Sequence, residues 1–451
     1  MIPSYLLSGI PGIAYYLYYK TYCRKIPEIY AGDGSFIDLL RQKCPILSEE
    51  YNPIPMFHHS TVMTVLASFA RHRGLTFPFV REAYVCADGG EVILDWWTGK
   101  RTTTAAKLLA SVAEVNVAEE LASHSESGLV TAEKITEPSF MNDEDLSEEV
   151  AKTALLNLPA AEAVVLILPG LTGDSTQNYV RGLVQASDSL GLMAVVMNYR
   201  GVSGSLKTPR SYCGADTSDV AEVVNHVKDL YPNLPLIAVG VSLGGILLTN
   251  YLAKCGKENA DSRVLGGFTV STPWNIAASC KVLEEPLNYY IFNRHLAQNL
   301  CAAANRHSEM LSKVPGLDLE QLKNVRTIKD FDHNFTAKMF GYESADDYYK
   351  SATPHDKVHQ IKTRLLAINA ADDMFSPYDA IPKEAAKENP NVCIMVTSHG
   401  GHIGFLEWNP FGINFVERVF SQYVKALLQK PEYGRLQFQP EEVDAAPFTA
   451  I

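Results

Sequence analysis

Ser242 stands at the centre of the segment with the strongest chemical signal in the chain. Glycines flank it at a spacing of two residues, Gly240 and Gly244, between the apolar run 236–240 and the helical stretch 246–254. A nucleophile on a sharp turn from strand to helix has a strained backbone, in which only small flanking residues avoid a clash, and its hydroxyl is exposed. The segment therefore predicts Ser242 as a nucleophile.

A serine hydroxyl attacks a carbonyl only when a base removes its proton, so this prediction requires a histidine and a carboxylate that orients it. Asp372 and Asp373 follow the apolar run 363–369, and His402 follows the run 392–397. The order serine, aspartate, histidine is one of the known orders of such a triad. We favour Asp373 because it directly precedes Met374-Phe375 at the strand exit, and we expect Asp372 to cap or support the loop.

His399 competes with His402 for the role of the base. A pair of glycines precedes His402 and Gly404 follows it. Glycines give the flexible and closely packed loop that a catalytic histidine needs. We therefore expect His402 to take the proton of the serine.

Two backbone amides are expected to bind the negative charge that develops on the substrate oxygen. The amide of Leu243 would lie at the N-terminus of the helix after the nucleophile, where negative charge is stabilised. The second donor should lie in the loop after the first buried strand, and the glycine-rich segment 167–174 fits this place. Leu171 is the expected donor there, with Thr172 as a near alternative. The segment 198–201 ends another strand and is expected to support the site.

The composition sets limits on other kinds of chemistry. The chain has 451 residues, and 39 Lys and Arg against 51 Asp and Glu give a net charge of −12. Without a basic stripe, nucleic-acid binding is not expected, and the expected partner is a lipid or another acyl ester. The eight cysteines form no CxxC pair, so neither a zinc site nor a disulfide scaffold is expected. A neighbouring base activates the serine, so no cofactor or metal is needed.

Short runs rich in Val, Ile and Leu must position these groups. Runs of this kind are buried on both faces of a parallel sheet, and the segments between them are long enough for crossover helices. They lie at residues 163–168, 192–198, 236–240, 264–270, 363–369 and 392–397. The pattern predicts an α/β fold with a mostly parallel, doubly wound sheet. Residues 84–97 add an edge hairpin around the turn 88–90, and residues 414–428 are expected to form a closing helix.

The expected domain covers residues 45–429 and contains two long excursions. Residues 99–158 are rich in Ala, Ser, Thr and Glu and show no strand pattern, which predicts a surface insertion. Residues 272–350 are helical and rich in aromatic side chains, which predicts a helical lid that would line an acyl pocket. Residues 430–451 form a tail without a strong pattern.

Residues 1–25 form a hydrophobic N-terminal segment. No charged side chain precedes Lys20, and at about 1.5 Å per residue the uncharged stretch is slightly shorter than the ~30 Å core of a bilayer. Tyrosines suit the headgroup boundary, whereas Pro11 weakens a straight helix. We expect this segment to associate with a membrane, either as a single span or as an interfacial helix. The following basic residues favour a cytosolic body and the sequon at Asn334 favours a lumenal one, so the side stays open.

Five motifs resemble those of the abhydrolase domain-containing proteins 1 and 3, a membrane-associated branch of the α/β-hydrolases with bacterial relatives. They are Pro169-Gly-Leu-Thr-Gly173, Asn198-Tyr-Arg-Gly201, Gly240-Val-Ser-Leu-Gly-Gly245, Asn369-Ala-Ala-Asp-Asp373 and Gly400-Gly-His-Ile-Gly-Phe405. The resemblance covers the chain from about residue 45 to about residue 425. It implies an α/β-hydrolase fold and a serine hydrolase triad of Ser242, Asp373 and His402. It also implies an N-terminal membrane segment and activity on lipid esters such as phosphatidylcholine.

These observations lead to one hypothesis and two alternatives. The hypothesis is a serine hydrolase, a phospholipase or carboxylesterase, that cleaves acyl esters of lipids through an acyl-enzyme. An acyltransferase would use the same triad and differ only in the acceptor, which the sequence does not separate. A non-catalytic lipid-binding protein on the same fold would be expected to lack the nucleophile or the base, and both are present.

Overall fold

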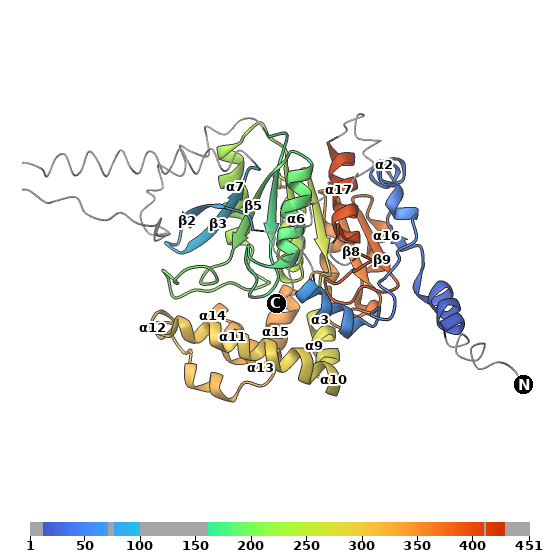
Figure 1. Cartoon of the computed structure of the whole chain (residues 1–451). Coiled ribbons are helices and arrows are strands. Elements are labelled where there is room, and N and C mark those ends of the chain that lie inside the picture. The colour runs from blue at the N-terminus through green and yellow to red at the C-terminus, as the bar shows by residue number, and fades with distance from the viewer. Residues whose placement is uncertain (1–11, 71–75, 100–160, 410–411, 429–451) are drawn as a thin grey trace, which may run out of the picture.

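A nine-stranded sheet runs through the residues that the computed structural model describes, which are 12–70, 76–99, 161–409 and 412–428 (Figure 1). The strand order is β1-β9-β8-β7-β6-β4-β5-β3-β2. The strands are β1 (Glu28–Tyr30), β2 (Val80–Val85), β3 (Glu91–Trp97), β4 (Val164–Leu168), β5 (Met193–Asn198), β6 (Leu236–Val241), β7 (Gly266–Val270), β8 (Leu365–Ala370) and β9 (Val392–Thr397).

The strands β4 to β9 pair in parallel and correspond to the six apolar runs of the sequence. Every residue of these strands is buried, because helices cover both faces of a parallel sheet and leave no polar side. The predicted α/β fold with a mostly parallel sheet is therefore confirmed.

Antiparallel strands form both edges of the sheet. The predicted hairpin is present as β2 and β3, and β3 pairs with β5. At the opposite edge β1 pairs with β9. This short strand was not predicted, because three residues are too few to show an alternating pattern.

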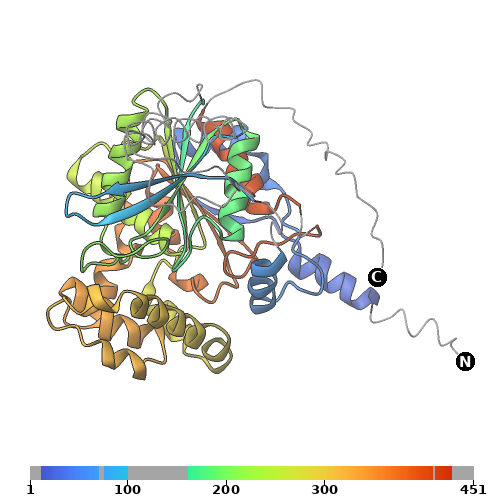
Figure 2. The same cartoon turned by 60° about the vertical axis from the view of Figure 1, so that its left-hand side comes forward.

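Helices on the two faces of the sheet create two apolar cores (Figure 2). One core takes side chains from α7 (Ser218–Leu230), α8 (Leu243–Glu258) and α16 (Lys383–Glu388). The other takes side chains from α2 (Ser35–Lys43), α6 (Asn178–Ser189) and α17 (Phe415–Leu427). The last of these is the predicted closing helix.

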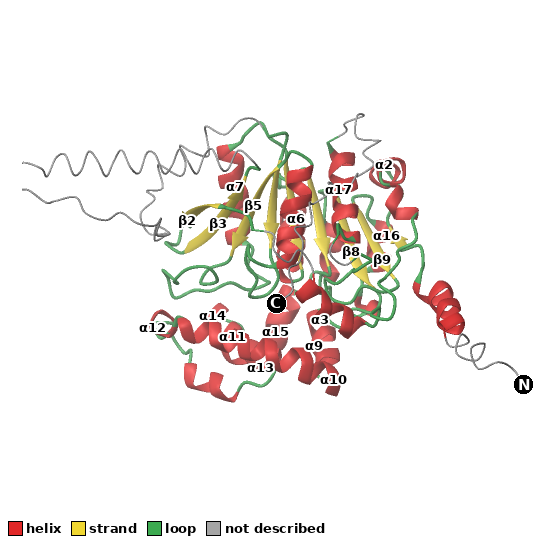
Figure 3. Ribbon diagram, viewed as in Figure 1, coloured by secondary structure: helices red, strands yellow, loops and turns green. Residues whose placement is uncertain are grey.

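A separate layer of helices lies between β7 and β8 in the chain and packs below the sheet in the view of Figure 3. We call residues 276–352 the helical cap. Its elements are α9 (Ile276–Leu283), α10 (Pro286–Asn288), η3 (Tyr289–Asn293), α11 (Arg294–Arg306), α12 (Ser308–Leu311), η4 (Leu319–Asn324), α13 (Ile328–Phe331), η5 (Asp332–Thr336), α14 (Ala337–Phe340) and α15 (Ala345–Ala352), and η6 (His355–Gln360) leads back to the sheet. The cap has a small apolar core of its own, which includes Leu300, Leu311, Phe331 and Phe335. It occupies the place of the expected lid.

The N-terminal part of the described chain is helical at residues 12–18 and in η1 (Tyr19–Cys23). The short helices η2 (Pro45–Ser48) and η7 (Tyr378–Ala380) and the helix α3 (Ser60–Ala70) complete the fold. Among the described residues, none of the helices combines the length and the apolar character needed to cross a bilayer. Residues 1–11, residues 100–158 of the expected insertion and the tail 430–451 lie outside the described residues.

Candidate active site

Ser242 lies on the turn between β6 and α8. Its backbone has φ 53° and ψ −114°, a conformation that costs about 1–3 kcal/mol for a residue other than glycine. A Cβ atom on Gly244 would lie 2.0 Å from the carbonyl oxygen of Leu168, and one on Gly240 would lie 2.3 Å from the carbonyl oxygen of Gly244. Both glycines are therefore required for the chain to make this turn.

His402 connects Ser242 to Asp373. Its Nε2 lies 2.9 Å from Oγ of Ser242, and its Nδ1 lies 3.0 and 3.1 Å from the two carboxylate oxygens of Asp373. Because an ionised carboxylate only accepts hydrogen bonds, Nδ1 carries the proton and Nε2 is free to accept one from the hydroxyl. The side chain of Asp373 is fully buried and that of His402 is 9% exposed. The structure thus brings together three residues that are far apart in the chain.

Two further residues fix the orientation of this arrangement. The amide of Phe375 donates to a carboxylate oxygen of Asp373 at 2.8 Å, and the Phe375 ring stacks on the imidazole of His402 with centroids 4.2 Å apart. The amide of His402 donates to Oγ1 of Thr64 in α3 at 2.8 Å. No local pattern distinguishes Thr64, because α3 carries several serines and threonines and only the tertiary fold brings one of them to the loop.

The two alternative residues of the sequence analysis contact other groups. Asp372 accepts a hydrogen bond from the amide of Gly401 at 2.9 Å, and burial raises the pKa of its carboxyl to about 7. The Nδ1 of His399 lies 3.1 Å from Oγ of Ser398, and burial lowers the pKa of this imidazole to about 4. Asp372 thus supports the loop, whereas His399 belongs to a different cluster.

The candidate oxyanion donors lie beside the serine. Leu243 is the first residue of α8, and amides in the first turn of a helix have no acceptor within it. The amide of Thr172 donates to the hydroxyl of Tyr212 at 3.3 Å, so it is engaged elsewhere. Leu171 and Leu243 line the same cavity as Ser242, and both stay predictions as donors.

A cavity of about 890 Å³ contains Ser242 and His402 in its wall. Its volume is in the range of sites that enclose a small organic ligand. Apolar side chains prevail in the lining, and the cap contributes Leu283, Ile291, Leu300, Ile328, Phe331 and Phe335. The helix α3 forms another part of the wall.

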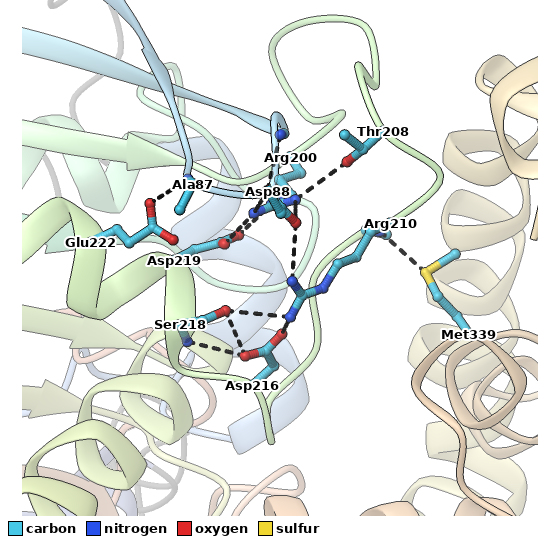
Figure 4. Close-up of polar contacts among 12 residues, drawn as sticks. Ala87, Asp88, Arg200, Thr208, Arg210, Asp216, Ser218, Asp219, Glu222 and Met339 are labelled. Atoms are coloured by element: carbon cyan, nitrogen blue, oxygen red, sulfur yellow. Dashed lines mark hydrogen bonds and ion pairs between the residues drawn. The ribbon is translucent and has the colours of Figure 1, made fainter.

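The glycine turn after β5 supports the site, as expected from its sequence. The hydroxyl of Tyr199 donates to the carbonyl of Pro169 at 2.7 Å, at the start of the loop that carries the expected second oxyanion donor. Arg200 is buried and forms ion pairs with Asp88 and Asp219 at 2.7 and 2.6 Å (Figure 4). The hydrogen bond from Arg200 holds the pKa of Asp88 well below its usual range. Since Asp88 lies in the turn of the β2–β3 hairpin, this network joins the sheet edge to the strand end.

Comparisons with known proteins agree with this architecture. The family described as alpha/beta hydrolase fold matches residues 163–408, more than half of the chain. A Mus musculus protein named Phospholipase ABHD3 is 36% identical over 420 residues, which cover 92% of this chain and 88% of that protein. A Saccharomyces cerevisiae protein named Monoacylglycerol lipase is 33% identical over 258 residues, which cover 56% of this chain and 57% of that protein. These similarities confirm the resemblance drawn from the five motifs, and the chain belongs to the α/β-hydrolase family.

Proposed function

We propose that this chain is a serine hydrolase that cleaves acyl esters of lipids. The observation that carries the proposal is the 2.9 Å contact between Oγ of Ser242 and Nε2 of His402, whose other nitrogen is held by the buried carboxylate of Asp373. Such an arrangement converts a weakly nucleophilic hydroxyl into one that attacks a carbonyl. Membership of a hydrolase family supports the same conclusion.

In the first half-reaction, Oγ of Ser242 attacks the acyl carbonyl carbon while its proton moves to Nε2 of His402. The carboxylate of Asp373 stabilises the imidazolium that forms. The amides of Leu243 and Leu171 bind the negative charge on the carbonyl oxygen. His402 then gives the proton to the leaving alcohol oxygen, the ester C–O bond breaks, and the acyl group remains on Ser242.

In the second half-reaction, a water molecule gives its proton to Nε2 of His402 and its oxygen adds to the acyl carbon. The bond to Oγ of Ser242 breaks, the serine takes the proton back, and the fatty acid leaves. The neighbouring base supplies the activation of both nucleophiles, so these steps use no metal or organic cofactor.

Two observations support a lipid as the acyl donor. The cavity beside Ser242 has a volume of about 890 Å³ and mostly apolar walls, which suits an acyl chain. The similar proteins from mouse and yeast are named Phospholipase ABHD3 and Monoacylglycerol lipase. We therefore propose phospholipids of the phosphatidylcholine type as the substrate class.

Fatty-acid release from phosphatidylcholine and from a monoacylglycerol tests this function. The purified chain is expected to release fatty acid, and the Ser242→Ala variant is expected to be slower by at least about 10³-fold, because it lacks the attacking oxygen. Equal release by both proteins would show that the function is wrong. Adding glycerol as an acceptor extends the assay, since an excess of new ester over free fatty acid would assign acyl transfer instead.

A further inference from the structure

One face of α3 exposes apolar side chains to solvent. Val62, Val65 and Phe69 are 42%, 38% and 60% exposed. Their spacing of three and four residues places them on the same side of the helix. Side chains of this size are normally buried when they gather on one face, so this stripe indicates an interaction surface.

A second apolar stripe lies at the start of the helical cap, in α10 and η3. Leu287, Tyr290 and Ile291 are 57%, 70% and 37% exposed. Tyr290 and Ile291 follow Leu287 by three and four residues, so both lie about one turn further along the chain. Both views of the fold place α3 beside the part of the cap that holds α9 and α10 (Figures 1 and 2).

The two stripes border the same cavity. Val65 and Phe69 from α3 and Ile291 from η3 are exposed to solvent and also line the cavity that contains Ser242. The helix α3 and η3 therefore both contribute to the part of the cavity wall that reaches solvent. We call Val62, Val65, Phe69, Leu287, Tyr290 and Ile291 the apolar rim.

We propose that the apolar rim binds the surface of a lipid bilayer and that a lipid passes from the bilayer between α3 and η3 into the cavity. An acyl chain that takes this route stays in contact with apolar groups. An acyl chain that passes through water instead loses the favourable free energy of its burial in the bilayer. None of the six side chains is charged, so a zwitterionic surface suffices. Binding to the bilayer is independent of the proposed function, and only the passage of the lipid rests on it.

Hydrogen exchange tests where the bilayer binds. The Ser242→Ala chain is used, so that the lipid stays intact, with and without vesicles of a long-chain phosphatidylcholine. Amides of residues 60–70 and 286–293 are expected to exchange more slowly with vesicles, while those of the β2–β3 hairpin stay unchanged. Unchanged exchange at both parts of the rim would overturn the proposal, even if the chain sediments with vesicles through its N-terminal segment.

Kinetics test the route of the lipid. The variant Val62→Ser/Leu287→Ser/Tyr290→Ser changes only rim residues that do not line the cavity. Its kcat/KM on phosphatidylcholine vesicles is expected to fall by at least about tenfold, since burial of even one of the three side chains is worth about tenfold in binding. Its kcat/KM on a soluble short-chain ester is expected to stay within about twofold of wild type.

Val85→Ser serves as the matched control, because Val85 is 53% exposed at the end of β2. It is expected to leave both rates unchanged. A rim variant that hydrolyses vesicles as fast as wild type would overturn the route. If wild type hydrolyses neither substrate, the proposed function fails, and the exchange measurement still decides whether the rim binds a bilayer.

An independent cluster lies where the N-terminal segment meets the loop of His402. Sγ of Cys23 and one ring nitrogen each of His58 and His399 lie within 4.8 Å of one another. Cys23 is fully buried, and both histidines are half-buried. Each histidine has a hydroxyl near Nδ1, from Tyr15 at 3.4 Å for His58 and from Ser398 at 3.1 Å for His399.

Thiolate and imidazole are the ligands that Zn²⁺ prefers, and a hydroxyl oxygen that accepts a hydrogen bond from Nδ1–H leaves Nε2 free to bind a metal. Zinc bonds of about 2.0–2.3 Å require ligand atoms about 3.3–3.6 Å apart, so the side chains need to approach only slightly. We infer that Cys23, His58 and His399 bind Zn²⁺, with a fourth position open to water. The metal would join the N-terminal segment to the loop that carries His402.

Metal analysis tests this site. The purified full chain is loaded with Zn²⁺ and desalted, and the metal is counted by mass spectrometry. Cys23→Ser and His58→Gln are two separate single-residue variants of the cluster. Wild type and the control Cys255→Ser are each expected to retain one more zinc ion per chain than either of these variants. With Co²⁺ in place of zinc, a thiolate-to-cobalt absorption band is expected in wild type and not in Cys23→Ser. Equal zinc in wild type and in both cluster variants would overturn the site.

Discussion

The substitution Asp373→Asn separates the role of this carboxylate from simple packing, because it keeps size and shape. In the native site one oxygen of Asp373 accepts from the amide of Phe375 at 2.8 Å, and both oxygens lie 3.0–3.1 Å from Nδ1 of His402. The oxygen of an asparagine would keep the bond to Phe375, which turns its NH₂ group towards Nδ1. Nδ1 would then accept a hydrogen bond from that NH₂ group, and Nε2 would carry the ring proton and face Oγ of Ser242.

A histidine in that tautomer cannot take the proton of Ser242. We expect kcat/KM for an ester substrate to fall by about 10⁴-fold, which is about 5 kcal/mol of transition-state stabilisation. Asp372→Asn is the matched control, since the carboxylate of Asp372 accepts a hydrogen bond from the amide of Gly401, whereas that of Asp373 holds the imidazole of His402. For Asp372→Asn a loss of less than about tenfold is expected. Thermal unfolding of both variants shows whether the fold is intact.

Two results would contradict this reasoning. An Asp373→Asn protein within tenfold of wild type would show that the carboxylate does not set the tautomer of His402. An Asp372→Asn protein as impaired as Asp373→Asn would show that the choice between the two aspartates is wrong.

Three further predictions concern the supports of the site. Thr64→Val removes the acceptor of the His402 amide and is expected to lower kcat/KM by about fivefold, in line with about 1 kcal/mol for one hydrogen bond; an unchanged rate contradicts this role. Because burial raises the pKa of Asp372 to about 7, its contribution to stability is present below about pH 4 and is lost as pH rises to about 7. The melting temperature of Asp372→Asn relative to wild type is therefore expected to rise over that pH range, and a constant difference contradicts it. Gly244→Ala places a Cβ 2.0 Å from the carbonyl oxygen of Leu168 and is expected to lower the free energy of unfolding by more than about 2 kcal/mol, as measured with denaturant; a loss below about 0.5 kcal/mol contradicts it.

The sequence predicted the sheet well because strands buried on both faces leave continuous apolar runs. The predicted run 236–240 is β6, which ends at Val241, and the predicted run 392–397 is β9. The turn at Ser242 was also predictable, because only glycine fits at the two flanking positions, 240 and 244. Local sequence patterns therefore sufficed to predict most of the fold and the position of the nucleophile.

Features that depend on distant contacts were missed. The hydrogen bond from His402 to Thr64 joins residues far apart in the chain. The sequence around one of these residues does not indicate that the other is its partner. The cluster of Cys23, His58 and His399 has no short spacing of the kind that marks zinc sites in a sequence. No metal site was therefore expected from the sequence.

Identification of the residue that a fluorophosphonate modifies tests the central claim most directly. The probe phosphonylates an activated serine, and peptide mass spectrometry then locates the adduct. We predict one adduct, on the peptide that contains Ser242, formed rapidly in wild type and at least about 10³-fold more slowly in His402→Gln. Modification of a different serine, or equal rates in wild type and His402→Gln, would contradict the claim that His402 activates Ser242.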